Sequence, residues 1–323
     1  MIATFVHPIS KRPLIPDPEG NLMYAGQEQS VLRHIDGCYN FTDFLEAHTQ
    51  EQAHYDSHYH HSHKPETGVE LTKEYLKNLW DGNSSFNLLY ETVGDIQGKD
   101  ILLLGNGTSV KEFSFVMEGG DVVYTDLSVE AALFGKKCFE NSALHHEAVG
   151  RVQFHTVDAL HMPFADESFD LIYGCAVVHH IQELHPFFAE VYRCLKNGGK
   201  CIFLDDAESK WWNVAKKTIL RPLQIISHRR TGISPEDKLA TERGGYGKEE
   251  LRHILTMQKF SDLTHKRTMF FEHLIRRGMM KLLHESLGRA LVPLGRFVDN
   301  RLLGPRFMKR NGLLLVWGAQ KGR

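Results

Sequence analysis

The sequence has few cysteines and no long apolar run. Five cysteines occur in 323 residues without a Cys-x-x-Cys pair, which argues against a disulfide framework and a cysteine zinc site. No apolar run approaches the roughly 18 residues of a membrane-spanning helix, and prolines interrupt the N-terminal stretch where a secretory signal needs a continuous apolar core. We therefore expect a cytoplasmic protein with reduced thiols.

Basic residues are scarce in the first two thirds of the chain. Residues 1–208 hold 14 Lys/Arg and 31 Asp/Glu, a net charge of −17. Residues 209–323 hold 24 Lys/Arg and 9 Asp/Glu, a net charge of +15, so the total of −2 conceals an uneven distribution. A basic C-terminal third suits an anionic substrate, a membrane surface or nucleic acid, and it equally suits packing against the acidic part or a second subunit. The sequence does not indicate an oligomeric state.

The pattern of apolar residues divides the chain into three regions. Residues 1–45, which are punctuated by Pro and Gly, predict a small module of short strands and turns, and residues 46–98 predict helices. From residue 99 onward, apolar runs alternate with helix-length segments, which is typical of a parallel sheet wrapped by helices. The expected strands are 100–105, 121–126, 152–158, 169–175, 200–206, 262–271 and 312–320, and the expected helices among them are 109–118, 128–141 and 183–196.

A glycine loop follows the first of these strands. Gly105, Asn106 and Gly107 come directly after the run ILLL, where an open parallel sheet places its ligand crevice. Asp126 ends the second strand, a position from which a carboxylate accepts hydrogen bonds from the ribose hydroxyls of an adenosine. Val110 stands where the dinucleotide-binding pattern has its third glycine, and this argues against a pyrophosphate cofactor such as NAD.

Four stretches of the chain, in register, resemble the class I S-adenosylmethionine-dependent methyltransferases. They are LLLGNGTS, VVYTDLS, VDALHMPFADESFDLIYGCAVVHHI and EVYRCLKNGGKCIFLDD, and they cover about residues 99–206. The resemblance implies an α/β, Rossmann-like fold with a seven-stranded, mostly parallel sheet whose last strand is antiparallel. It also implies S-adenosylmethionine as the cofactor. The family's usual third glycine is Ser109 here, a change of modest cost because this cofactor carries no pyrophosphate.

The same resemblance assigns cofactor contacts. The glycine loop would cradle the methionine part, Asp126 would bind the ribose, and the residues after the third and fourth strands would meet the adenine and the sulfonium. An N-terminal helix with two tyrosines would close over the cofactor, although packing tyrosines are an alternative interpretation. The expected cofactor-binding residues are Gly105, Asn106, Gly107, Thr108, Asp126, Leu127, Asp158, Ala159, Gly174, Cys175, Tyr55 and Tyr59.

Two adjacent histidines follow the fourth strand. Methyl transfer requires a base only when the acceptor must lose a proton, and a positioned base is worth about 10²–10⁴-fold. His179 and His180 are the catalytic candidates, with His180 favoured by the resemblance, and a bridge between loops is the alternative role.

A histidine-rich stretch, HYDSHYHHSH at residues 54–63, raises the question of a metal. His54 and His58 have the i,i+4 spacing of two ligands on one helix face. Because no acidic or cysteine partner at a recognised spacing accompanies them, we predict no metal.

The two ends of the chain carry weaker signals. Residues 5–44 resemble a small zinc-ribbon-like module in which His7 to Ser10 replace the opening Cys-Pro-x-Cys, so this module would be free of metal. Residues 207–260 and 272–311 read as amphipathic basic helices inserted on the acceptor side of the methyltransferase domain, which spans 99–323. A helical cap on the sheet is their favoured role, with peripheral membrane contact as the alternative.

The interpretation is a methyltransferase acting on a small-molecule acceptor in biosynthesis, through an oxygen, nitrogen or carbon nucleophile. The composition of the insertion favours an apolar or aromatic acceptor that bears an anionic group. RNA or protein methylation is a second reading, but the stretch GCAVVHH after the fourth strand is not an NPPY-like motif, so nucleic acid is not the expected partner. A third interpretation is a non-catalytic, methyltransferase-like subunit.

Overall fold

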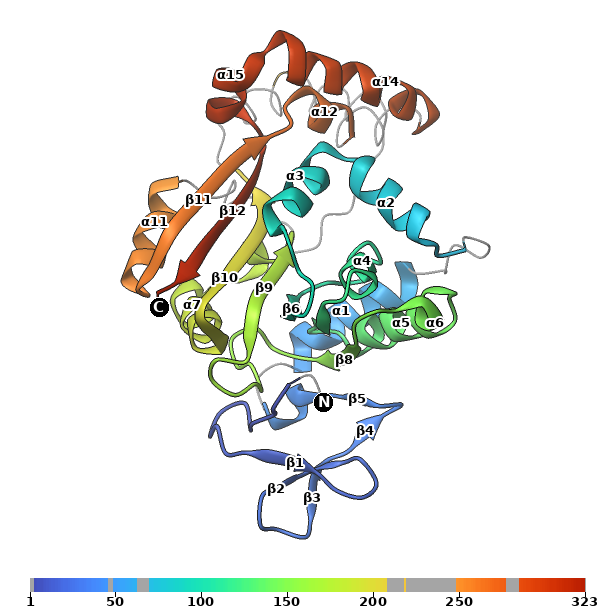
Figure 1. The fold of residues 1–323 in the computed structure, drawn as a ribbon, viewed down its shortest axis with the longest axis vertical. Helices are drawn as coiled ribbons and strands as arrows, with labels where there is room; N and C mark the ends of the chain where they lie inside the picture. The colour runs from blue at the N-terminus through green and yellow to red at the C-terminus, as the bar shows by residue number, and fades with distance from the viewer. Residues whose placement is uncertain are drawn as a thin grey trace.

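The fold is built around one seven-stranded sheet with helices on both faces (Figure 1). The computed structural model describes residues 3–45, 49–62, 70–207, 218, 248–276 and 285–322. The strands are β6 (Asp100–Leu104), β7 (Asp121–Asp126), β8 (Val152–Thr156), β9 (Phe169–Cys175), β10 (Leu195–Asp206), β11 (Phe260–Thr268) and β12 (Leu314–Lys321). The sheet order is β11-β12-β10-β9-β6-β7-β8.

Strand direction confirms the expected fold class. Strands β8, β7, β6, β9 and β10 pair in parallel, whereas β12 runs antiparallel to both β10 and β11. The central strands are apolar throughout because both of their faces are covered, as in β6, where four consecutive residues are buried. The carboxyl ends of β6, β7, β9, β10 and β11 therefore share one edge of the sheet.

Helices cover the sheet in two separate packed layers. On one face, α2 and α3 bury Leu76, Trp80 and Leu89 against the sheet, and on the other face α7 and α11 bury Phe187 and Leu251. The helices of the described chain are α1 (Thr49–Ser62), α2 (Lys73–Asp81), α3 (Ser84–Val93), α4 (Phe113–Met117), α5 (Val129–Glu140), α6 (Leu144–Glu147), α7 (Leu184–Cys194), α11 (Lys248–Met257), α12 (Phe271–Leu274), α14 (Glu285–Phe297) and α15 (Gly304–Asn311), with the single turns η1 (Phe41–Phe44), η2 (Val178–His180) and η5 (Val298–Leu302).

Two expected boundaries differ from the structure by four or five residues, each for a physical reason, and the strand expected at 262–271 ends at Thr268 because Phe271 begins α12. The helix expected at 109–118 is α4, which begins only at Phe113, because the preceding residues form the glycine loop and a buried polar cluster described below. The strand expected at 200–206 begins at Leu195, which pairs with Phe169 before a register shift that ends at Lys200. The turn-like stretch KNGGK is thus an irregularity within β10.

The N-terminal region consists of short strands and turns. Strands β1 (Leu14–Pro16), β2 (Leu22–Tyr24) and β3 (Ser30–Leu32) make an antiparallel sheet, and β4 (His34–Ile35) pairs with β5 (Cys38–Tyr39). The module packs against the β8 edge of the central sheet, through single bridges that join Asn40 to Thr156 and Phe5 to Phe164. Within the described parts of the chain, no cluster of three or more His, Cys, Asp or Glu side chains is placed to hold a metal.

The C-terminal helices lie beyond one edge of the sheet. Helices α12, α14 and α15 follow β11 and precede β12, at the top of Figure 1 and far from the N-terminal module. Helix α11 directly precedes β11. Most of the insertion expected at 207–260 falls outside the described residues. In the described part of the chain, no helix has both the length and the apolar character that crossing a bilayer requires.

Candidate functional site

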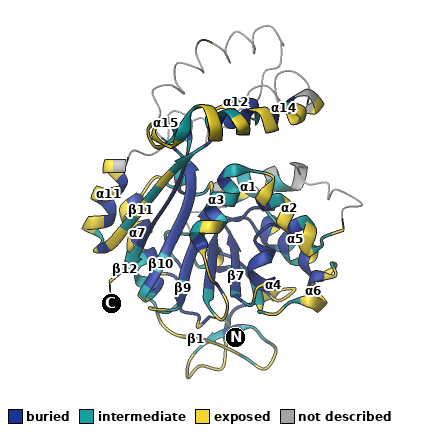
Figure 2. Cartoon of the chain, turned by 45° about the horizontal axis from the view of Figure 1, so that its top comes forward, coloured by how far each residue is buried: buried dark blue, intermediate teal, exposed yellow. Residues whose placement is uncertain are grey.

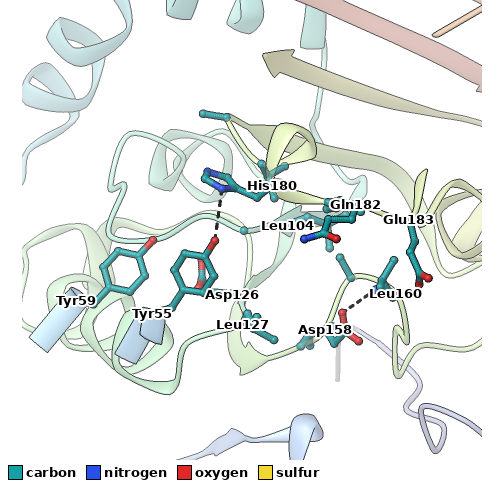
Figure 3. A pocket seen from close by; sticks show the side chains of 16 residues that line it. Tyr55, Tyr59, Leu104, Asp126, Leu127, Asp158, Leu160, His180, Gln182 and Glu183 are labelled. Atoms are coloured by element: carbon teal, nitrogen blue, oxygen red, sulfur yellow. Dashed lines mark hydrogen bonds between the residues drawn. The ribbon is translucent and has the colours of Figure 1, made fainter. Parts of the chain in front are cut away.

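A pocket with a volume of about 350 Å³ opens at the carboxyl ends of β6, β7 and β9, with α1 along one side (Figure 3). This volume is within the range of small-molecule sites, and the edge is the one at which open α/β sheets bind ligands. The lining residues are Tyr55, Tyr59, Leu104, Gly105, Asp126, Leu127, Val157, Asp158, Ala159, Leu160, Ala176, Val177, His180, Ile181, Gln182 and Glu183.

The glycine loop requires glycine at two positions. Gly105 and Gly107 have φ angles of +56° and +54°, in the left-handed region that side chains rarely adopt. A Cβ atom on Gly105 would also lie 2.3 Å from Cγ2 of Val177, and one on Gly107 would lie 2.7 Å from the hydroxyl oxygen of Tyr59. Helix α1 therefore approaches the loop as closely as a glycine allows.

Asp126 joins this loop to the next strand. Its carboxylate accepts hydrogen bonds from the backbone N–H of Gly107 at 2.7 Å and of Ser128 at 2.9 Å. Burial raises the pKa of Asp126 to about 6, and the two backbone hydrogen bonds only partly offset this effect. The carboxylate lines the pocket, so its remaining lone pairs can accept hydrogen bonds from a ligand's hydroxyl groups.

Asp158 lies on the apolar side of the pocket. It accepts a hydrogen bond from the backbone N–H of Leu160 at 2.9 Å, and its other oxygen is 2.6 Å from Nδ1 of His161. Leu127 lines the pocket beside it (Figure 3), and Ala159 is also part of the lining. An acidic edge next to small apolar surfaces is suited to a flat ring that carries an amino group.

The two adjacent histidines have different surroundings. The ring of His180 lines the pocket, and its Nδ1 lies 3.4 Å from the hydroxyl of Tyr55 (Figure 3). Nδ1 of His179 instead lies 2.9 Å from Oδ1 of Asp205, a buried carboxyl group whose pKa is raised by burial. His179 does not line the pocket, so the geometry favours His180 as the group that meets a substrate.

The structure brings together eight of the fourteen residues expected from the sequence. The eight that line the pocket are Gly105, Asp126, Leu127, Asp158, Ala159, Tyr55, Tyr59 and His180. The others are not among the residues that line it: Asn106, Gly107, Thr108, Gly174, Cys175 and His179. Gly174 is covered by Val177, whose methyl carbon would be 2.5 Å from a Cβ atom there. The two positive φ angles of the loop fall on glycines, and Asn106 has an ordinary backbone conformation.

Residues after β9 form a wall of the pocket that the sequence analysis missed. Ala176 adopts a φ of +58°, a strained value for a residue with a side chain, and its N–H donates to the carbonyl of Leu204. Ile181, Gln182 and Glu183 continue the wall (Figure 3). Their position between a strand end and α7 was the available signal, because such loops surround the sites of parallel sheets.

A buried ion pair beneath the glycine loop was also missed. Lys111 Nζ and Glu112 Oε1 are 2.5 Å apart, and both residues are buried. Glu112 also accepts hydrogen bonds from the hydroxyls of Ser109 at 2.7 Å and Tyr173 at 2.8 Å, and the Lys111 ammonium donates to Ser109 Oγ at 2.9 Å. Ser109, at the position of the absent glycine, is thus part of the structure that supports the loop. The signal for this cluster was a Lys-Glu pair inside the apolar run VKEFSFVM.

Cys175 lies against the same cluster. Burial raises the pKa of its thiol to about 11, against the opposing effect of the nearby Lys111 ammonium. The thiol is therefore protonated at neutral pH, which argues against a nucleophilic role.

Comparison with known proteins agrees with the fold. A sequence model described as a methyltransferase domain matches residues 102–203, which include β6 through most of β10. A phosphoethanolamine N-methyltransferase of Triticum aestivum is 30% identical over 148 residues, which are 44% of this chain and 24% of that enzyme. A demethylmenaquinone methyltransferase of Renibacterium salmoninarum is 27% identical over 145 residues, 44% of this chain and 57% of that enzyme.

A geranyl diphosphate C-methyltransferase of Streptomyces coelicolor is 14% identical in a structural superposition that covers 79% of this chain and 83% of that one, with a TM-score of 0.49. The chain spans only about a quarter of the first curated relative. The residues that the methyltransferase-domain model matches include the glycine loop, Asp126 and Asp158. Residues 102–203 are therefore a methyltransferase domain, and the strand order is that of the class I S-adenosylmethionine-dependent methyltransferase fold.

Proposed function

We propose that the protein transfers the methyl group of S-adenosylmethionine to a small-molecule acceptor. One observation carries this proposal: a single pocket is lined both by Asp126 and Asp158, which lie at or just after the ends of neighbouring strands, and by the pair Tyr55 and His180 (Figure 3). In this arrangement the two carboxylates hold the adenosine part, with Asp126 on the ribose and Asp158 on the adenine edge. The space toward His180 is left for the acceptor.

The chemistry asks little of the protein beyond alignment. Methyl transfer is an in-line displacement at a sulfonium methyl group, so orientation and exclusion of water supply most of the acceleration. Tyr55 and Tyr59, both on α1, cover the site and exclude water. His180 takes the proton of an acceptor that must lose one, and the hydroxyl of Tyr55 orients its ring.

The pocket lining favours an apolar or aromatic acceptor. Besides His180, the lining includes Val177, Ile181 and Leu160, and none of the described lining residues is Lys or Arg. Among the relatives, demethylmenaquinone is a more apolar compound than phosphoethanolamine, so it is the better guide to the acceptor. An anionic group on the acceptor, as the sequence predicts, would be met by cations outside this described lining.

Calorimetric titration with S-adenosylmethionine and with its demethylated product tests the proposal. We expect micromolar binding that Asp126→Ala weakens at least tenfold, because the ribose hydroxyls lose their acceptor. Asp166→Ala, which changes an exposed aspartate at the other end of the sheet, is the matched control and leaves binding unchanged. Absence of binding at high micromolar cofactor would instead favour a non-catalytic subunit.

Transfer of a labelled methyl group to candidate acceptors tests the second half of the proposal. We expect transfer to a prenylated or aromatic nucleophile and none to phosphoethanolamine. Transfer to RNA, with binding that falls steeply as salt rises, would replace the small-molecule acceptor by nucleic acid.

A further inference from the structure

The outward face of the C-terminal helices exposes large apolar side chains among cations. Leu294 is 57% exposed, Phe297 55% and Leu302 68%, although residues of these types are usually buried. Arg301, Arg306 and Arg310 are exposed on the same helices, α14, η5 and α15. We call these six residues the C-terminal helical surface. Figure 2 shows the exposed residues along α14 and α15, on the side away from the sheet.

One acidic side chain on these helices, that of Asp299, is turned inward. Residues 285–311 hold six Lys/Arg and two Asp/Glu. One of the acids, Asp299, is buried and accepts hydrogen bonds at 2.9–3.0 Å from the backbone N–H groups of Phe270, Phe271 and Glu272 at the start of α12. Arg296 also points inward, to Glu272 and the carbonyl of Gly82. The remaining outward cations are therefore not neutralised by the buried carboxylate of Asp299.

The combination of aliphatic and cationic groups fits one kind of partner. A helix that lies in a membrane interface presents apolar side chains to the acyl chains and Arg or Lys to anionic headgroups. Nucleic acid would use the cations but gains little from exposed leucines, since bases stack on aromatic or guanidinium planes. The charge of the chain as a whole supports this orientation, because the −17 of residues 1–208 is repelled by an anionic surface that attracts the +15 of the remainder.

We propose that the C-terminal helical surface docks the protein on anionic phospholipid membranes. The helices that carry it leave the sheet at the carboxyl end of β11, the edge at which the pocket also opens. Docking therefore places this edge toward the bilayer and gives the pocket access to an acceptor dissolved in lipid. That last consequence rests on the proposed function, whereas the docking itself does not.

Vesicle co-sedimentation of the full chain tests the proposal without any methyl transfer. We expect binding to vesicles of phosphatidylcholine with phosphatidylglycerol, weaker binding at high salt, and little binding to phosphatidylcholine alone. The triple variant Leu294→Ser/Phe297→Ser/Leu302→Ser should lose at least about tenfold in affinity. Replacing Arg301 and Arg306 by Gln should cost about fivefold for each cation removed.

A matched control uses apolar residues that are equally exposed elsewhere. Ile9→Ser/Val149→Ser removes side chains that are 62% and 69% exposed, outside the C-terminal helices, and should bind vesicles like the unaltered protein. Equal loss in the control, or no loss in the triple variant, would overturn the proposal. Two other results, each without vesicle binding, would also overturn the proposal. One is a dimer in light scattering that dissociates in the triple variant, and the other is RNA binding that requires the arginines. Retained cofactor binding in calorimetry shows that the variants are folded and separates failure of docking from failure of the proposed function.

Discussion

The backbone N–H of Gly107 donates a 2.7 Å hydrogen bond to Oδ2 of Asp126, so the glycine loop and the end of the second strand form one unit. Without ligand, the buried carboxyl group is stabilised mainly by this N–H and that of Ser128. Its pKa of about 6 shows that these two bonds do not compensate for the loss of water. Hydroxyl groups of a bound ribose would supply the missing donors.

Cofactor affinity should therefore depend on pH. Because the proposed hydrogen bonds require ionised Asp126, affinity should rise by up to about tenfold per pH unit below pH 6 and level off above it. Titration calorimetry at pH 5 to 8 measures this dependence. In Asp126→Asn, which has no carboxyl group to titrate, affinity is weak and should not change across that range.

The same pKa affects the stability of the free protein in the opposite sense. The folded pKa lies above the ordinary value of 3.8, so this group's contribution to the free energy of unfolding is greatest below pH 3.8 and is lost as pH rises to about 6. The loss amounts to about 3 kcal/mol. Saturation with cofactor should remove this loss of stability. Urea unfolding at pH 4 and 7, with and without cofactor, measures the free energies of unfolding that test this.

Tyr55 and His180 should affect turnover more than cofactor binding. With an acceptor that must lose a proton, His180→Gln should lower kcat by about 10²–10⁴-fold. Tyr55→Phe, which removes the hydroxyl 3.4 Å from the ring, should lower kcat by a smaller factor. Steady-state kinetics at varied pH measures both. The matched change His179→Gln should mainly destabilise the fold, because it removes the imidazole ring that contacts buried Asp205. A fall in kcat equal to that of His180→Gln, with unchanged stability, would contradict this assignment.

Ser109→Gly should destabilise the protein although it restores a glycine to the loop. The change removes the hydroxyl that bonds Glu112 and Lys111 in a buried cluster, at a cost of about 1.5–3 kcal/mol for bonds to charged groups. Chemical denaturation measures the cost. Ser109→Ala separates the side chain from the backbone, because it loses the same bonds without adding glycine flexibility. Cofactor affinity should change little in both variants, since Ser109 does not line the pocket.

The sheet and its acidic strand ends could be predicted because their signals are local. Apolar runs punctuated by turns indicate the strands of such a sheet, and Asp126 and Asp158 stand at the ends of two of the expected strands, 121–126 and 152–158. The choice between His179 and His180 could not be made this way. The two lie in one tight turn, η2, and which ring meets the pocket depends on Asp205, which is 26 residues farther along the chain, and on Tyr55, 125 residues before.

Contacts between distant segments also explain the features that were missed. Besides local Ser109, the Lys111–Glu112 pair is supported by Tyr173 from β9, which donates to Glu112, and by the ring of Phe86 from α3, which lies 4.6 Å from the Lys111 ammonium. The sequence gives no measure of such pairings, so an apolar run with two charges was read as an ordinary helix. That reading placed the start of α4 four residues too early.

The N-terminal module should detach from the domain in acid because of His155. Its buried ring stacks on Tyr39, and Nδ1 accepts the backbone N–H of Tyr39 at 3.2 Å, so the ring is neutral. Burial lowers the pKa of His155 from 6.5 to about 3, and the stability that this group contributes is therefore complete above pH 6.5 and is lost as pH falls toward 3. The slope is about 1.4 kcal/mol per pH unit.

The variant His155→Asn keeps an acceptor near Nδ1 but cannot titrate. Urea denaturation at pH 4 to 7 gives the free energy of unfolding, whose slope against pH should be smaller in this variant by the contribution of about one proton. His146→Asn, at an exposed position, should keep the original slope, and equal slopes in His155→Asn and the unaltered protein would show that His155 is not the group that titrates.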